Sequence, residues 1–110
     1  MNLKILSLDN FLKEVKKLHK RYKSISKDLK LLKEELKNNP RSGTKLGNNC
    51  YKIRLANSSV PTGKSGGFRV VYYYVDENNN IFLVHIYSKS DTGNISENKI
   101  LEILKTSRLV

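Results

Sequence analysis

The feature that most constrains the fold of this chain is a change of apolar pattern at Pro40. Before the proline, apolar residues recur at steps of three and four, which is the spacing of one stripe on an amphipathic helix. These residues form two groups: Phe11, Val15, Leu18 and Tyr22, then Ile25, Leu29, Leu32 and Leu36. Proline restricts the residue before it to extended backbone, so the second helix should end at Asn38-Asn39-Pro40. The first 40 residues therefore predict a helical hairpin.

After Pro40 the pattern is that of strands. Apolar and basic residues alternate over 51–56, and 68–75 is rich in aromatic and β-branched residues. The polar run 76–80 predicts a hairpin turn that leads into a returning strand over 81–87. We also expect a short strand over 3–8 and a last helix capped by Ser96.

Taken together, these elements give the order βααβββα. Grouped helices and hairpin-linked strands indicate an α+β domain, with the helices packed on one face of a mostly antiparallel sheet. The length of 110 residues fits one domain spanning residues 1–110.

The charge balance limits the classes of partner. Lysine and arginine number 21 against 10 acidic residues, a net charge of +11. Such an excess attracts polyanions, with nucleic acid as the leading class and anionic lipid as its rival. Ten of these cations lie on the helical hairpin, where they form either a solvated surface or a docking surface for RNA phosphates. One cysteine and no apolar run long enough to cross a bilayer predict a cytoplasmic protein without membrane attachment.

Strand parity predicts which side chains share a surface. One face should be core, formed by Tyr51, Ile53, Leu55, Phe68, Val70 and Tyr72, with Phe82, Val84 and Ile86 joining them beneath the helices. The other face then collects Lys52, Arg54, Arg69, Val71, Tyr73, His85 and Tyr87, with Lys89 just beyond. Charges facing apolar helices would be costly, so we expect the second face to be open. Arg69 stands out because its strand is otherwise almost entirely apolar.

The residues of the open face indicate a particular chemistry. His19, His85 and the single cysteine have no metal-ligand spacing, and no serine–histidine–carboxylate set is apparent. We therefore expect neither a metal nor a cofactor. Cations with tyrosines suit RNA cleavage in which the substrate supplies its own 2′-hydroxyl nucleophile. The cations would stabilise the phosphorane charge, and a lysine or tyrosine with a lowered pKa would move the proton.

Several segments resemble one family, the RelE/HigB toxins of bacterial type II toxin–antitoxin systems. The segment from Leu32 through Glu35-Leu36 and Asn39-Pro40 to Leu46-Gly47 resembles their helix-to-strand junction. The run 50–55 is similar to their second strand, 63–72 to the loop and third strand of the HigB-like branch, and 86–90 to the end of the fourth strand. The resemblance covers roughly residues 10–105.

The resemblance implies a microbial-RNase-like fold that cleaves mRNA in the ribosomal A site without a cofactor. It also implies a cognate antitoxin, expected to carry a helix-turn-helix DNA-binding domain. Lys52, Arg54 and Arg69 match the cations that carry catalysis in relatives. RelE has a catalytic tyrosine near its C-terminus, whereas 93–100 contains none here, so Tyr87 or Lys89 is expected to take that role. The predicted RNA contacts are Lys64, Ser65, Tyr73 and His85.

Two other functions remain open. A ParE-like toxin shares the fold but inhibits DNA gyrase by binding it, and such a toxin would not need cations on the open face. A non-catalytic nucleic-acid-binding module would use the same charges without chemistry.

Overall fold

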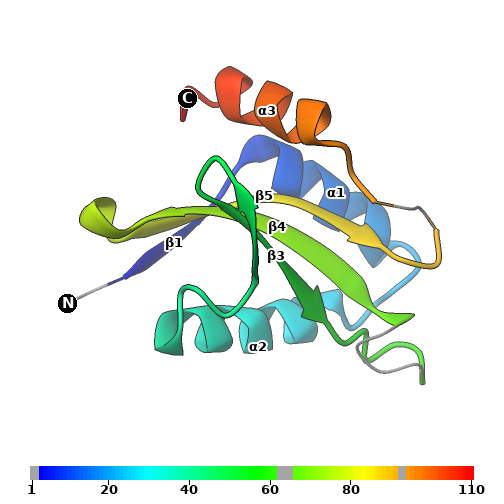
Figure 1. Ribbon diagram of the computed structural model, residues 1–110. Helices are drawn as coiled ribbons and strands as arrows, with labels where there is room; N and C mark the ends of the chain where they lie inside the picture. Colours follow the sequence, from blue (N-terminus) through cyan, green and yellow to red (C-terminus); the bar gives the residue numbers. More distant parts are fainter. Residues whose placement is uncertain (1–2, 62–65, 92–93) are drawn as a thin grey trace.

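The computed structural model describes residues 3–61, 66–91 and 94–110, and its elements follow the predicted alternation of helices and strands (Figure 1). The helices are α1 (Asp9–His19), α2 (Ile25–Asn38) and α3 (Glu97–Thr106). The strands are β1 (Lys4–Ser7), β2 (Thr44–Gly47), β3 (Cys50–Leu55), β4 (Phe68–Val75) and β5 (Asn80–Ser88). The α+β class is confirmed. The strand β2 was not predicted, because Gly43, Gly47, Asn48 and Asn49 indicate a loop over this stretch.

The strands form one sheet in the order β1-β5-β4-β3-β2. β2, β3, β4 and β5 pair antiparallel with their neighbours, while β1 pairs parallel with β5, so the sheet is mostly antiparallel as predicted. The turn between β4 and β5 is a single 3-10 turn over Asp76–Asn78 followed by Asn79 in the left-handed region (φ 52°). Asparagine tolerates that conformation better than most residues, which explains a turn there.

One face of the sheet packs on the helical hairpin. Phe11 of α1 and Leu32 of α2 are fully buried against β-strand residues such as Val70 and Tyr72. The same cluster contains Tyr51, Ile53, Leu55 and Phe68, so the predicted core face of β3 and β4 is confirmed. The lone Cys50 is buried, and burial raises the pKa of its thiol to about 11.

The other face is partly covered by α3, which differs from the expectation of helices on one face only. Ile103 and Leu104 of α3 pack on Val71, Tyr73 and Val84, and Figure 1 shows α2 and α3 on opposite sides of the sheet. The helix α3 and the helical hairpin therefore lie on opposite faces of the sheet, because the apolar side chains of α3 pack on these strand residues.

The prediction for β5 was right for Ile86 and wrong for Phe82 and Val84. Ile86 lies in the hairpin cluster, but Phe82 and Val84 lie in the α3 cluster. The cause is a β-bulge, because Val71 pairs with His85 while Tyr72 pairs with Leu83. Val84 is thus an extra residue, and the residues of β5 before it point to the opposite faces from those that strict alternation predicts. None of the helices in the described part of the chain has the length and apolar character needed to cross a membrane.

Candidate functional site: a row of cations and a tyrosine

Three side chains lie side by side across the sheet near the ends of β3 and β5. Arg54 of β3 pairs with Arg69 of β4, and Arg69 pairs with Tyr87 of β5. Directly paired residues on antiparallel strands have Cβ atoms about 4.5–5.5 Å apart and point to the same face. We call Arg54, Arg69 and Tyr87 the cross-strand row. Lys52 lies two residues before Arg54, on the same face, as strand parity predicted.

The row is electrostatically unfavourable for a purely structural sheet. Like charges directly opposite one another destabilise a strand pair, and Arg69 is only 5% exposed. The guanidinium of Arg69 donates to the carbonyl of Phe68 (3.3 Å). Packing alone therefore gives no reason for two adjacent arginines at this position.

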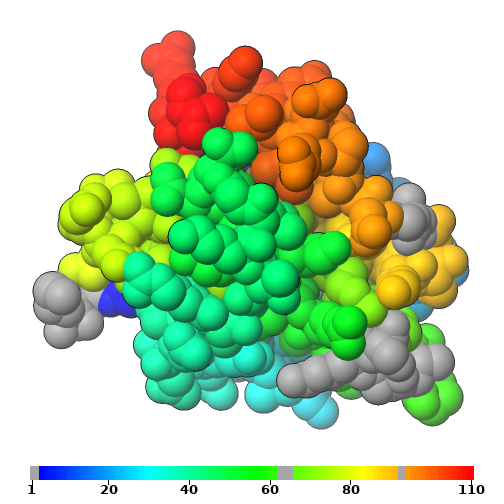
Figure 2. Space-filling model, in the orientation of Figure 1, coloured from blue at the N-terminus to red at the C-terminus, as the bar shows by residue number. Residues whose placement is uncertain are grey.

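A residue from a third element completes the site. Asn94, in the segment leading into α3, accepts hydrogen bonds at its Oδ1 from Lys52 Nζ and from the Tyr87 hydroxyl, each at 3.4 Å. In Figure 2 the orange segment before α3 lies beside the yellow end of β5 and close to the green of β3. Sequence reasoning missed Asn94, because an isolated asparagine after a chain break has no periodic or motif signal.

The hydroxyl of Tyr87 is held in its neutral form. Burial is the main influence and raises the pKa of Tyr87 above its ordinary value, while the positive charge of Arg69 and a backbone hydrogen bond with Ile95 act in the opposite direction. The expectation of a tyrosine with a lowered pKa is therefore wrong for Tyr87. At neutral pH this hydroxyl is a proton donor, suited to act as a general acid.

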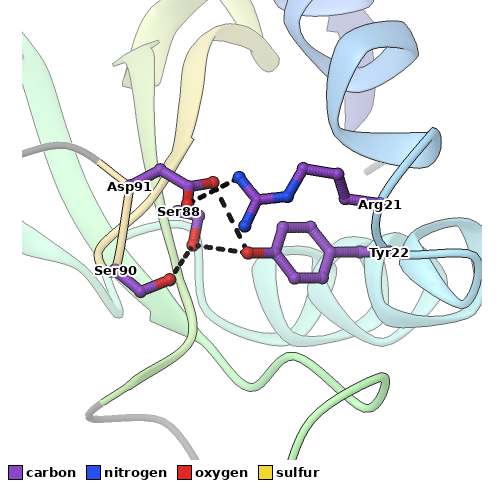
Figure 3. A network of polar contacts seen from close by, with 5 residues as sticks. All are labelled: Arg21, Tyr22, Ser88, Ser90 and Asp91. Carbon is purple, nitrogen blue, oxygen red and sulfur yellow. Dashed lines mark hydrogen bonds and ion pairs between the residues drawn. The ribbon is translucent and has the colours of Figure 1, made fainter.

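The end of β5 is fastened to the helical hairpin by a polar network (Figure 3). Asp91 forms an ion pair with Arg21 (2.6 Å) and accepts from the Tyr22 hydroxyl (3.4 Å). Ser88 lies 3.5 Å from the same hydroxyl and 2.9 Å from Ser90 Oγ. This network fixes where the chain leaves β5, one residue after Tyr87.

The exposed Lys89 lies at that exit, and its backbone N–H donates to the carbonyl of Gly67 (3.1 Å). Gly67 itself passes very close to β3, since a Cβ there would lie 2.2 Å from the carbonyl oxygen of Leu55. Only glycine permits this approach of the backbone at position 67 to Leu55, the residue that follows Arg54.

The predicted RNA contacts are not all brought to the row. Tyr73 is buried under α3, where its hydroxyl donates to the carbonyl of Leu109 (3.4 Å), so its ring is not presented to solvent. Half-buried His85 lies beside α1, where Asn10 Nδ2 approaches its Nδ1 (2.9 Å); its ring centroid is 6.0 Å from that of Tyr87. Lys64 and Ser65 fall outside the described residues.

The electrostatics of the site favour anions over metal ions. Its described side chains are cations, a phenol and an amide, none of which is an anionic metal ligand. Over residues 3–61, 66–91 and 94–110 there is also no cluster of three or more His, Cys, Asp or Glu residues able to hold a metal. The arrangement can bind a phosphate, stabilise added negative charge on it and donate a proton.

Comparison with known proteins gives one family and one fold. Residues 11–109 match the family described as the RelE toxin of the RelE/RelB toxin–antitoxin system. Among solved structures, an E. coli RelE mutant with two arginines replaced by alanine, in the free state, aligns with a TM-score of 0.59 and 20% identity over all of both chains. The isolated E. coli RelE toxin aligns with a TM-score of 0.58 and 22% identity over 99% of this chain and 100% of that one. At these identities the two structures establish the shared fold.

Proposed function

The chain belongs to the RelE toxin family of toxin–antitoxin systems, and from this premise we propose that it is an mRNA endonuclease that acts on the ribosome without a metal. By cutting translated mRNA it would stop protein synthesis and growth. The observation that carries the proposal is the cross-strand row, in which Arg69 lies between Arg54 and the protonated hydroxyl of Tyr87. Two adjacent arginines repel each other, but together they can stabilise the negative charge that is spread over the oxygens of a phosphodiester under attack.

The reaction uses the 2′-hydroxyl of the substrate as nucleophile. Its oxygen forms a bond to phosphorus and gives its proton to a water molecule of the solvent, the bond from phosphorus to the 5′-oxygen breaks, and that oxygen takes up a proton. The products are a 2′,3′-cyclic phosphate and a 5′-hydroxyl. Arg54 and Arg69 stabilise the negative charge of the phosphorane, and Tyr87 donates the proton to the leaving oxygen. Lys52 and Lys89 bind flanking phosphates or assist this proton transfer.

Two partners follow from the same proposal. Membership of the family implies a cognate antitoxin, for which we propose a protein with a helix-turn-helix DNA-binding domain. The substrate is mRNA in the ribosomal A site, where the ribosome orients the scissile phosphate. The proposal retains Lys64, Ser65 and His85 as RNA contacts.

Induced expression of wild type and of Arg69→Ala tests the proposal. Primer extension on cellular mRNA should map new 5′ ends within translated frames for wild type, while folded Arg69→Ala should give neither new ends nor growth arrest. Lys30→Ala, which removes an exposed cation from α2, is the control and should behave as wild type.

Two results would overturn the proposal. Full toxicity and cleavage by a folded Arg69→Ala protein would place the chemistry elsewhere. Intact mRNA together with arrested DNA supercoiling would instead indicate a gyrase inhibitor of the ParE kind.

A further inference from the structure

Asn94 is exposed, yet its side chain contacts two residues of the site. Its side chain faces Lys52 from β3 and Tyr87 from β5, two residues that the sheet itself separates by one strand. An exposed asparagine without a role would be solvated, and would not meet a cation and a phenol from two different strands. Two strands thus meet the amide of a residue from a third segment of the chain.

The chemistry of the partners fixes the orientation of the amide. An ammonium group can only donate hydrogen bonds, so the atom of Asn94 that faces Lys52 Nζ must be the oxygen. The same oxygen accepts from the Tyr87 hydroxyl. The amide nitrogen, with two N–H donors, therefore points away from both partners, on an exposed side chain that RNA can reach. Both bonds are 3.4 Å long, as is common for site hydrogen bonds that tighten only with substrate.

The chain that follows Asn94 is anchored to α3. Ser96 caps α3 by accepting a hydrogen bond from the Lys99 backbone N–H (3.2 Å), and Ile95 packs in the α3 cluster. At the end of β5, Asp91 is held by its ion pair with Arg21 (Figure 3). The side chain of Asn94 is thus presented to the row from the anchored start of α3, as a positioning role requires.

We propose that Asn94 is a positioning residue of the cleavage site: its amide oxygen holds the Tyr87 hydroxyl and the Lys52 ammonium in place, and its amide nitrogen donates to a phosphate oxygen of the RNA. The inference rests on the proposed function for its meaning in catalysis. The interaction with Tyr87, however, exists in the free protein and can be measured there.

The first test is a titration of the free protein. The ¹³Cζ resonance of Tyr87, assigned by its loss in Tyr87→Phe, reports the pKa of that hydroxyl. An oxygen that accepts from the hydroxyl stabilises its neutral form, so Asn94→Ala should lower the pKa of Tyr87. Asn94→Asp keeps an acceptor and adds a negative charge, so it should raise that pKa. Asn98→Ala, an exposed asparagine in the first turn of α3, should leave it unchanged.

The second test is cleavage of mRNA on purified ribosomes under single-turnover conditions. Asn94→Ala should lower the rate constant by at least about 10-fold, because a misplaced group loses part of the advantage of orientation. Its affinity for the ribosome and its melting temperature should stay close to those of wild type and Asn98→Ala. The alkaline limb of the pH–rate profile should move to lower pH in Asn94→Ala and to higher pH in Asn94→Asp.

The two tests separate the inference from the proposed function. If wild type cleaves, but Asn94→Ala has the wild-type rate, pH profile and Tyr87 titration, the positioning role is wrong and the endonuclease stands. If wild type does not cleave ribosome-bound mRNA, the endonuclease is wrong. A Tyr87 pKa that moves in opposite directions in the two variants would still support the contact between Asn94 and Tyr87.

Discussion

The two faces of the central sheet are used in different ways. Against the helical hairpin, β3, β4 and β5 present mainly apolar and aromatic side chains, of which Phe68, Val70 and Ile86 are fully buried. The opposite face is divided: α3 covers Val71 and Val84, while the cross-strand row lies beside Asn94, in the segment that leads into α3. One face is devoted to stability, and the other combines a smaller core with a charged site.

The difference teaches how so small a domain can hold like charges together. Arg69 and Arg54 bring like charges opposite one another, and a continuous core on the reverse side of the same strands stabilises the sheet that holds them. The small α3 core has a second task, since the same helix supports the segment that carries Asn94. Substitutions on the two faces should therefore have separable effects on stability and on cleavage.

The largest expected effect on stability is that of Leu32→Ala on the hairpin side. Leu32 is fully buried, so its truncation should lower the free energy of unfolding by about 2–5 kcal/mol, the usual range for a core leucine. Urea denaturation measures this loss. Below its melting temperature the variant should cleave ribosome-bound mRNA at the wild-type rate, because Leu32 lies on the face away from the row. A loss of cleavage in the folded variant would argue that the faces are coupled.

Ile103→Ala on α3 should show the opposite balance. Its loss of stability should lie at the lower end of about 2–5 kcal/mol, because the smaller α3 core near the surface can relax around the truncation. Its cleavage rate should nevertheless fall several-fold, since α3 supports the approach of Asn94 to the row. Measuring both quantities for Leu32→Ala and Ile103→Ala compares the two faces directly. A wild-type cleavage rate in Ile103→Ala would show that α3 does not support the cleavage site.

A smaller effect is expected from pH at His85, beside α1. Burial lowers the pKa of His85 from its ordinary 6.5, so the folded protein favours the neutral ring. The nearby charges are Glu14 and Lys17 of α1 and Lys99 of α3; Glu14 favours the charged ring and the lysines oppose it. The unfolded chain then binds the proton more readily, and stability should decrease as the pH falls through 6.5.

The measurement is the free energy of unfolding between pH 5 and pH 8 for wild type and His85→Gln. The variant should lose part of the decline on the acid side. His19→Gln, at an exposed histidine of α1, is the matched control and should keep the wild-type profile. Identical profiles for all three proteins would show that His85 titrates alike in the folded and unfolded chains.

The smallest effect on stability is expected from Asp91→Asn in the polar network. Arg21 is highly exposed, and ion pairs at the surface contribute little, so the free energy of unfolding should stay close to that of wild type. Cleavage should decrease less than in Asn94→Ala, because Ser88 and Tyr22 still hold the end of β5. A larger loss of cleavage than in Asn94→Ala would make the network, rather than Asn94, the main support of this segment.

The sequence predicted those parts of the molecule that depend on local periodicity. The helical hairpin, the core faces of β3 and β4 and the alignment of Lys52, Arg54 and Arg69 follow from periods of 3.6 and 2, which are properties of the backbone. The bulge at Val84 could not be foreseen, because one extra residue reverses parity without changing composition. The position of α3 and the contact of Asn94 with Lys52 depend on tertiary packing between elements distant in sequence.

The measurement that tests the central claim most directly is the single-turnover rate of cleavage of ribosome-bound mRNA by Arg54→Ala. Arg54 is exposed at the end of the cross-strand row, so its truncation should leave the fold intact. The rate constant should fall by about 100-fold, the usual cost of removing one group that stabilises transition-state charge. The control Lys45→Ala, an exposed cation on neighbouring β2, should retain the wild-type rate. Equal rates for Arg54→Ala and Lys45→Ala would contradict the assignment of the row as the site of RNA cleavage.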